Sequence, residues 1–370
     1  MNIKNLRKID WWIPVCAILL CIIGLAALFS ASYDTGLEEF KKQAIWIVAS
    51  IVMMIITMII DYKILVKISP ILYGLAIILL IAVLFTEPVN GARSWFEIGD
   101  GLFSFQPAEI SKIFIILFLS YIISIVQRKG RNEINKIGKL LLILLAVGVP
   151  LILIIIEPDY GTATAYIIAT ILMTFVAGID KKYIIITAVI IAIAVPVSYR
   201  FILPEHAKQR IDTFLNPEED PRGKGYNVLQ SKLAIGAGQI TGMGILEGNQ
   251  TQLGYLYPKT TDFIFSVIGE EMGFIVAGGV IILNVLIITK SIQVAKGIKD
   301  EAGAYVATGI AGIILFHTLE NIGMTMGLLP ITGVPLLFVS YGGTSMMTSF
   351  ICIGIILNIS SQRRTGMFNK

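Results

Sequence analysis

Ten long apolar runs divide this chain of 370 residues. Each run is near or above the roughly 20 residues that an α-helix needs to cross the hydrocarbon core of a membrane. Strands of a membrane barrel would instead alternate apolar and polar residues over about 10 positions. The sequence therefore predicts an all-α polytopic membrane protein with ten transmembrane helices at about 12–32, 41–60, 66–86, 107–127, 138–156, 160–178, 183–202, 262–289, 303–326 and 334–357.

The low content of charged residues supports a single membrane domain. Only 15% of the residues are charged, whereas soluble domains carry about 25%. A soluble chain of this length would need several domains with polar surfaces, and the polar residues for them are missing. We therefore treat residues 1–370 as one membrane domain.

Basic residues mark one side of the predicted helix bundle. They occupy both termini and every even-numbered loop, with Arg7, Lys63 and Lys181 as examples. Cytoplasmic loops are enriched in Lys and Arg, so both termini are predicted to be cytoplasmic. The loop at 87–106 and the larger one between helices 7 and 8, at 203–261, have mixed charge and are predicted to be extracytoplasmic. The net charge of +4 is thus a topology signal, and we predict no nucleic-acid site from it.

An acidic residue, Asp262, stands where the largest loop meets the eighth predicted span. A carboxylate at the mouth of a membrane segment is costly unless it is paired or functional. Asp is also a favoured N-cap residue, so a structural role at the start of the helix is the alternative. Glu270 and Glu271 follow about 12 and 13 Å further along a helix. We interpret these two acids as structural or cavity-lining groups, too far away to share the proton of Asp262.

Arg93 and Trp95 lie in the smaller extracytoplasmic loop, just outside the membrane. Both residue types favour the membrane interface, so one interpretation is a simple anchor. Arg also binds phosphate in a bidentate manner, and the face of a Trp ring stacks on sugars. Contact with a substrate is therefore an equally good interpretation of this pair.

Two charged residues, Glu109 and Lys112, lie near the start of the fourth span. They are three positions apart, so they share one face of a helix and can form an ion pair. Charged residues inside a span can also line a polar cavity, which is the functional alternative. Pro107 suits the first turn of that helix, where a missing N–H has no cost. Asp159 is well placed to cap the helix that follows it.

The largest loop contains basic residues, including Arg210, and then a stretch suited to a short helix. Residues 227–235 place Val228, Leu233 and Ile235 toward one side. This pattern is typical of an amphipathic helix that lies on a membrane surface.

From the residues alone, two classes of function remain open. Basic groups can hold a phosphate, an aromatic ring can stack on a sugar, and one acid can act as a base, which suits an enzyme for a lipid-linked substrate. Buried acids also suit an ion-coupled transporter. Against the transporter, the sequence has no clear internal repeat and no paired broken helices.

At these motifs the chain resembles the SEDS family of cell-wall proteins (shape, elongation, division and sporulation), over essentially its whole length. Within the family it looks most like the RodA branch, in part because of the stretch from Gly248 to Leu253. The matching motifs, in chain order, are Gly91 to Trp95, Gln106 to Lys112, Glu157 to Gly161, Gln230-Ser231, Thr261 to Phe265 with Gly269 to Glu271, and Gly333 to Gly343.

The resemblance implies a peptidoglycan glycosyltransferase in the cytoplasmic membrane of a bacterium, with an extracytoplasmic active site. Its substrate would be lipid II, a disaccharide-peptide on undecaprenyl pyrophosphate. The enzyme would join these units into glycan strands during cell elongation and release undecaprenyl pyrophosphate.

The essential acid of the family falls on Asp262, which we expect to act as general base on the acceptor hydroxyl. Arg210 and Lys112 are expected to stabilise the leaving pyrophosphate, and Arg93 and Trp95 to hold the saccharide. The full set of expected substrate-binding residues is Arg93, Trp95, Glu109, Lys112, Arg210, Gln230 and Ser231.

The resemblance also implies partners, above all a class B penicillin-binding protein that cross-links the new glycan, together with other membrane proteins of the elongation complex. Asp262 would alternatively coordinate a divalent cation, Mg or Mn, that neutralises charge. Two other functions stay open, a flippase that moves lipid II between leaflets and a non-catalytic scaffold for the penicillin-binding protein.

Overall fold

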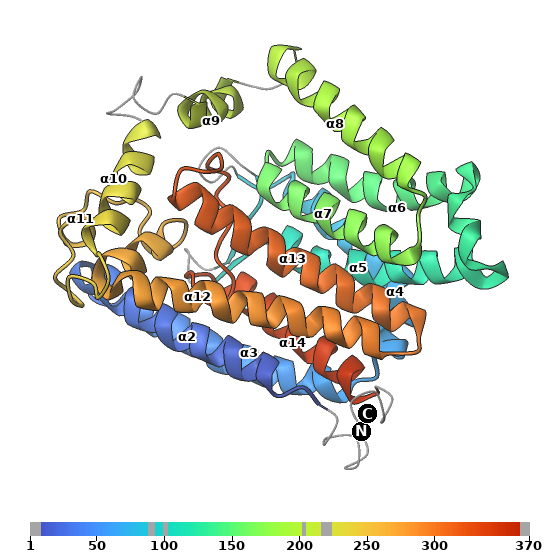
Figure 1. Ribbon diagram of the computed structural model, residues 1–370, viewed down its shortest axis with the longest axis horizontal. Coiled ribbons are helices and arrows are strands. Elements are labelled where there is room, and N and C mark those ends of the chain that lie inside the picture. Colours follow the sequence, from blue (N-terminus) through green and yellow to red (C-terminus); the bar gives the residue numbers. More distant parts are fainter. Residues whose placement is uncertain (1–8, 88–92, 99–102, 202–204, 216–223, 363–370) are drawn as a thin grey trace.

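The computed structural model describes residues 9–87, 93–98, 103–201, 205–215 and 224–362 (Figure 1). The short helices are α9 (Glu205–Leu215), α10 (Lys224–Ala237) and α11 (Asn249–Gln252), with 3-10 turns at Tyr33–Thr35, Gln127–Lys129 and Arg131–Asn135. The long helices are α2 (Trp12–Ala31), α3 (Glu38–Ile59), α4 (Tyr62–Val83), α5 (Pro107–Val126), α6 (Ile137–Ile156), α7 (Tyr160–Ala177), α8 (Lys181–Phe201), α12 (Ile264–Gly297), α13 (Glu301–Thr325) and α14 (Gly343–Ser361).

These helices match the predicted spans. Among the described residues, nine helices are long and apolar enough to cross a membrane, namely α2 to α7 and α12 to α14. The remaining predicted span, 183–202, coincides with α8, a helix of 21 residues. The prediction of an all-α, multi-pass membrane protein is therefore confirmed.

The eighth predicted span differs from its helix in one important way. The prediction was a single span at 262–289, but α12 extends to Gly297 and is interrupted at Gly273, where φ is 75° and ψ is −176°. On one side of this break, the Phe274 amide donates to the Gln239 carbonyl at 2.9 Å; on the other, the Gly244 amide donates to the Glu271 carbonyl at 3.0 Å. Glycine is required at 273 both by its positive φ and because a Cβ there would clash with the backbone of 241–242.

The tenth predicted span began at 334, but α14 begins only at Gly343. Residues 326–342 form an irregular segment, which we call the α13–α14 loop. Its apolar residues from Leu336 to Val339 are each at most 4% exposed. They are apolar because they are buried in protein, and sequence alone does not distinguish this from burial in lipid.

A short hairpin not predicted from the sequence lies in the smaller loop. Strand β1 (Phe96–Ile98) pairs antiparallel with β2 (Phe103–Phe105), and Phe96 lies opposite Phe105. The Thr344 hydroxyl at the start of α14 donates to the Ser104 carbonyl at 3.3 Å. This contact fixes the hairpin to the bundle.

The two ends of the bundle carry different structures. The start of α2 and the end of α14 lie together at one end (Figure 1), where the Asp10 amide donates to the Ser360 hydroxyl at 3.0 Å. Helices α10 and α11 lie at the opposite end with the start of α12, and we call this the loop end (Figure 1). The basic residues of both termini, such as Arg7, and the glycine of the motif at Gly91 lie outside the described residues.

Helices α13 and α14 form the centre of the bundle. Of the residues in their spanning windows, 78% and 83% are buried within the protein, compared with 22% in α4. Polar side chains on α13 therefore face other parts of the protein, and this helix is the framework on which the candidate site is built.

Helices α8 and α10 lie at the periphery. Helix α8 stands apart from the bundle (Figure 1), and its apolar residues Ile186, Ile190 and Ile193 are 50–60% exposed. Helix α10 includes the predicted helix at 227–235 and contacts α12, with Val228 buried. Its orientation relative to a membrane surface stays a prediction.

Candidate active site

Asp262 lies at the loop end, two residues before α12 begins at Ile264. The N-cap residue of α12 is Phe263, and no side chain makes a capping hydrogen bond there. The alternative that Asp262 caps this helix is therefore wrong. Its half-buried carboxylate is left available for chemistry.

Three features act on the pKa of the Asp262 carboxyl. Burial raises the pKa, whereas a hydrogen bond from the Thr261 side chain and the positive charge of Arg210 lower it. Burial dominates, so the pKa lies above its ordinary value of 3.8. A raised pKa makes a carboxylate a better proton acceptor at neutral pH.

The backbone of Asp262 is held by a buried amide on α13. The Asn321 Nδ2 group donates to the Asp262 carbonyl at 3.0 Å and to the Val334 carbonyl at 2.9 Å. Asn321 is fully buried, so both bonds are shielded from water. One side chain thus joins the candidate acid, the central helix and the α13–α14 loop.

The α13–α14 loop is fastened to the segment before Asp262 by further hydrogen bonds. The Ser340 hydroxyl donates to the Thr261 carbonyl at 2.8 Å, and the Tyr341 amide donates to the Thr260 carbonyl at 2.9 Å. A Cβ built on Gly333 would lie 3.5 Å from Asp262 Oδ2. The loop therefore forms one wall beside the carboxylate.

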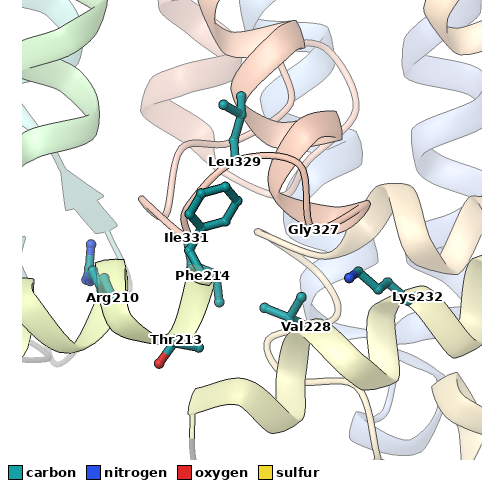
Figure 2. A pocket seen from close by; sticks show the side chains of 8 residues that line it. All are labelled: Arg210, Thr213, Phe214, Val228, Lys232, Gly327, Leu329 and Ile331. Atoms are coloured by element: carbon teal, nitrogen blue, oxygen red, sulfur yellow. The ribbon is translucent and has the colours of Figure 1, made fainter. Parts of the chain in front are cut away.

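Arg210, on α9, reaches the same wall. Its Nη1 donates to the Thr332 carbonyl at 3.4 Å. Glu320 on α13 holds the other side of that residue, because the Thr332 hydroxyl donates to Glu320 Oε1 at 2.8 Å. Arg210 lowers the pKa of Asp262 through its charge, and it also lines a pocket opposite Lys232 (Figure 2).

The predicted ion pair of Glu109 and Lys112 is confirmed inside the bundle. Lys112 Nζ lies 2.6 Å from Glu109 Oε1, and both side chains are at most 4% exposed. The Thr348 hydroxyl donates to Glu109 Oε2 at 3.3 Å. Lys112 Nζ also lies 2.9 Å from His317 Nε2. Two protein groups, Glu109 and His317, therefore hold the Lys112 ammonium.

The contacts of His317 fix its tautomer. An ammonium group only donates, so His317 Nε2 must accept from Lys112. The proton then resides on Nδ1, which donates to the Pro335 carbonyl at 3.0 Å. The ion pair is in this way connected to the same α13–α14 loop that lies beside Asp262.

The four other expected substrate-binding residues lie in different surroundings. Arg93 is exposed, and its Nη1 donates to the Leu84 carbonyl at the end of α4, at 3.2 Å. Trp95 and Gln230 are partly exposed. Ser231 is buried, and its hydroxyl lies 2.6 Å from both the Ser266 hydroxyl and the Thr325 carbonyl. Ser231 thus ties α10 to α12 and α13.

The side chains of Glu270 and Glu271 hold α11. Glu270 accepts from the amides of Gln250 and Thr251 at 2.7 and 3.0 Å. Glu271 Oε1 accepts from the Ser30 hydroxyl at 2.7 Å and from Gln252 Nε2 at 3.0 Å. Their structural role is therefore confirmed.

The turn between α6 and α7 contains a second unusual acid. Asp159 caps α7 as predicted, accepting from the Thr162 amide at 3.0 Å. Glu157 is fully buried, and neither of its carboxylate oxygens has a hydrogen-bond partner among the described residues. Burial, with a contribution from Asp159, raises the pKa of Glu157 to about 8. The protonated form of Glu157 is therefore favoured compared with an exposed glutamic acid.

The described side chains around Asp262 do not by themselves form a site for a divalent cation. Within the described ranges, no three His, Cys, Asp or Glu side chains converge as ligands would. The charged group that acts on Asp262 is the cation Arg210, which would repel a metal ion. We therefore derive no catalytic step through a metal.

Comparison with known proteins agrees with this geometry. The sequence profile of the family described as "Cell cycle protein", which comprises FtsW, RodA and SpoVE, matches residues 10–365. The chain belongs to this family. The resemblance to the SEDS family predicted from its motifs is thus confirmed over nearly the whole length.

Relatives from several branches of the FtsW/RodA/SpoVE family are similar to this chain. Peptidoglycan glycosyltransferase RodA of Treponema pallidum is 29% identical over 98% of this chain and 100% of that protein. Peptidoglycan glycosyltransferase MrdB of Escherichia coli is 33% identical over 94% and 92%. Stage V sporulation protein E of Bacillus subtilis is 33% identical over 96% and 98%.

Two solved structures share the family fold. One belongs to a peptidoglycan synthase complex that coordinates polymerization and crosslinking; it has a TM-score of 0.81 and 25% identity, covering 95% of this chain and 97% of that one. RodA of Thermus thermophilus has a TM-score of 0.71 and 22% identity, covering 97% and 98%. The match to the Thermus thermophilus structure supports the fold alone.

Sequence reasoning left Asn321 and Lys232 without a role. Asn321 had a usable signal, because His317, Glu320 and Asn321 are spaced i, i+3 and i+4 and so share one face of an apolar span. Polar residues inside a span are rare and mark functional or structural contacts. Lys232 gave no such signal, because it lies in a loop that contains many other charged residues.

Proposed function

We propose that the protein is a peptidoglycan glycosyltransferase that polymerises lipid II at the outer face of the bacterial cytoplasmic membrane. The observation that carries the proposal is the half-buried carboxylate of Asp262, which caps no helix. The backbone carbonyl of the same residue accepts a hydrogen bond from the Asn321 amide. Relatives named peptidoglycan glycosyltransferases match the chain over nearly its full length. The loop end would face outward, as the basic termini require.

Asp262 acts as general base in this mechanism. It takes the proton of the acceptor sugar hydroxyl while that oxygen bonds to the anomeric carbon of the donor. The bond from the anomeric carbon to the phosphate oxygen breaks, and undecaprenyl pyrophosphate leaves with the electron pair. A positioned base supplies about 10²–10⁴-fold in rate, so orientation and charge stabilisation must supply the rest.

Other residues assist without reacting. Arg210 stabilises the negative charge of the leaving pyrophosphate, because it lies next to the wall that borders Asp262. Asn321 is a positioning residue, since it is fully buried and holds the backbone of Asp262. Arg93 and Trp95 remain candidates to hold the saccharide. Lys112 is held by Glu109 and His317, and its contact with the pyrophosphate stays a prediction.

The partner we propose is a class B penicillin-binding protein. A structural relative works within a complex that coordinates polymerization and crosslinking, and crosslinking requires a transpeptidase. We assign the activity to cell elongation, because the stretch from Gly248 to Leu253 resembles the RodA branch. Other membrane proteins of an elongation complex would bind the assembled pair.

The decisive experiment is glycan polymerisation by purified Asp262→Asn with labelled lipid II, with and without the partner. Asn keeps the shape of the side chain but cannot accept the proton, so we expect polymer yield to fall by about 10²–10⁴-fold. The matched control is Asp34→Asn, which loses only a surface ion pair with Lys259 at 3.1 Å. Its yield should equal that of the unaltered protein.

Two outcomes would contradict the proposal. Normal polymer yield from Asp262→Asn would remove the catalytic role of the acid. Movement of lipid II between the leaflets of reconstituted vesicles, with no glycan formed under any condition, would favour the flippase alternative.

A further inference from the structure

Apart from Arg210, the residues of a pocket at the loop end have no role in the mechanism above. The pocket is a shallow, solvent-open depression between α9, α10 and the start of the α13–α14 loop (Figure 2). Its lining residues are Arg210, Thr213, Phe214, Val228, Lys232, Gly327, Leu329 and Ile331.

The pocket has a cation on each side and an apolar surface between them. Figure 2 shows the Lys232 ammonium directed toward Val228, with Arg210 on the opposite side beyond Phe214. Gly327 leaves the room that Lys232 occupies, because a Cβ at 327 would lie 2.7 Å from Lys232 Nζ. The position of the ammonium is therefore built into the loop.

Neither cation forms an ion pair within the described part of the protein. Lys232 forms no hydrogen bond or ion pair within that part of the chain. Arg210 uses one N–H there, in a long hydrogen bond of 3.4 Å to the Thr332 carbonyl. A guanidinium with free donors binds phosphate oxygens in a bidentate manner, and an ammonium binds them as a point charge. The pocket is therefore suited to a phosphate-bearing anion.

The apolar surface indicates that this anion carries a lipid chain. Phe214, Leu329 and Ile331 line the pocket between the two cations. Leu328 and Leu233, which adjoin lining residues in the sequence, are 65% and 56% exposed. A free phosphate would leave this apolar surface exposed to water, whereas the chain of a lipid phosphate would cover it.

We propose that this pocket binds the diphosphate of the lipid-linked donor, between Arg210 and Lys232, with the first units of its prenyl chain on the apolar residues. The inference rests on the proposed function and names a subsite of it. Arg210 connects the two parts, because it bonds to Thr332, and the next residue, Gly333, borders Asp262 Oδ2.

The arrangement matches the flow of charge in the reaction. When the bond from the anomeric carbon to the phosphate oxygen breaks, its electron pair stays on the diphosphate, which gains one negative charge. Lys232 and Arg210 stabilise that charge, while the acceptor proton moves to Asp262. Base and leaving group are thus served by different residues on either side of the α13–α14 loop.

The test measures binding of undecaprenyl diphosphate to the purified full chain, without turnover. We expect Lys232→Gln to weaken binding by about tenfold or more, because a charge-assisted hydrogen bond is lost. Lys232→Arg should restore binding close to the original level. The matched control is Lys296→Gln, which removes an exposed lysine from the other end of α12 and should bind normally.

The ligand arms distinguish the two sources of a lipid phosphate. Undecaprenyl monophosphate should bind more weakly than the diphosphate, and phosphatidylglycerol should not compete with it. Unchanged binding by folded Lys232→Gln would overturn the proposal. Equal competition by phosphatidylglycerol would also overturn it, since the pocket would then be a general site for anionic lipids.

The same assay separates this inference from the catalytic proposal. Asp262→Asn should bind undecaprenyl diphosphate normally, because the acid is not part of the pocket. If that variant also polymerised lipid II normally, the base would be refuted while the diphosphate site would still be judged by Lys232 alone.

Discussion

Two polar clusters in this bundle contain similar side chains but differ in how completely the protein satisfies them. In the ion-pair cluster, Lys112 contacts both Glu109 and His317, and all three side chains are buried. In the Asp262 cluster, the carboxylate caps nothing and Arg210 keeps most of its donors free within the described residues. The cation of the closed cluster is thus held by two protein groups, whereas the cation of the open cluster makes one long hydrogen bond within the described residues.

The difference between the two clusters shows that a buried charge in a membrane protein does not by itself mark a functional site. A buried charged pair suggests function, yet Glu109 and Lys112 mainly satisfy each other. The two clusters are nevertheless connected through α13, because His317 bonds to the Pro335 carbonyl and Asn321 bonds to the Val334 carbonyl. The closed cluster therefore supports the α13–α14 loop, which borders the Asp262 cluster.

Breaking the closed cluster should have the largest effect on stability. Lys112→Met leaves Glu109 buried and unpaired, which costs about 3–5 kcal/mol. The double variant Glu109→Gln with Lys112→Met should recover most of that loss, because no uncompensated charge remains. The measurement is chemical or thermal unfolding in detergent. A single variant as stable as the unaltered protein but unable to bind lipid II would show that Lys112 serves the substrate instead.

Asn321 tests the connection between the clusters. Asn321→Leu removes the donor from the buried Val334 carbonyl, which costs about 1–3 kcal/mol, and from the partly buried Asp262 carbonyl. We expect kcat for polymerisation to fall by about 10- to 100-fold, with little change in KM, because Asn321 positions Asp262 and is fully buried.

The matched control for this variant is Asn284→Leu. Asn284 is also fully buried, but its amide donates to Val280 of its own helix at 3.0 Å. It should lose stability without the selective loss of kcat. Equal kcat losses in the two variants would reduce Asn321 to a general packing residue.

Gly333 tests whether the space beside the Asp262 carboxylate is needed for activity. Its φ is 75°, a conformation that costs an L-residue about 1–2 kcal/mol. Gly333→Ala should therefore lose that stability and also lower kcat/KM, because the new Cβ would lie 3.5 Å from Asp262 Oδ2.

Gly254 provides the control, since it has the same φ of 75° and a Cβ added there would have nothing within 4 Å. Gly254→Ala should show the strain without the loss of activity. If both variants retained full activity, the space beside the Asp262 carboxylate would not be used by a substrate.

The sequence predicted the fold well because membrane spans are recorded as runs of about 20 apolar residues. It failed where apolar residues are buried in protein instead of lipid, as in Leu336 to Val339. It also missed the break at Gly273, which depends on backbone pairing with a distant loop.

For the site, the single residues Asp262 and Arg210 were predicted, but their surroundings were not. Asn321 is 59 positions from Asp262, and no pattern in the sequence records that contact. Lys112 was expected to face pyrophosphate because a charge in a span suggests function. Its engagement with His317 joins residues 205 positions apart and became visible only in the folded chain.

The smallest expected effect is a shift in pH dependence. The positive charge of Arg210 lowers the pKa of Asp262, against the larger effect of burial. Removing that charge in Arg210→Gln should raise the pKa further. A general base works only when deprotonated, so the acid limb of the profile of kcat/KM against pH should move to higher pH.

Lys232→Gln is the control for this shift, because Lys232 lines the pocket but does not act on the pKa of Asp262. Both variants should reduce kcat/KM through weaker binding of the diphosphate, yet only Arg210→Gln should move the acid limb. The difference between them separates charge that tunes the base from charge that holds the leaving group. An acid limb that stayed in place in Arg210→Gln would assign the limb to another group, and Asp262 would no longer be the base that controls it.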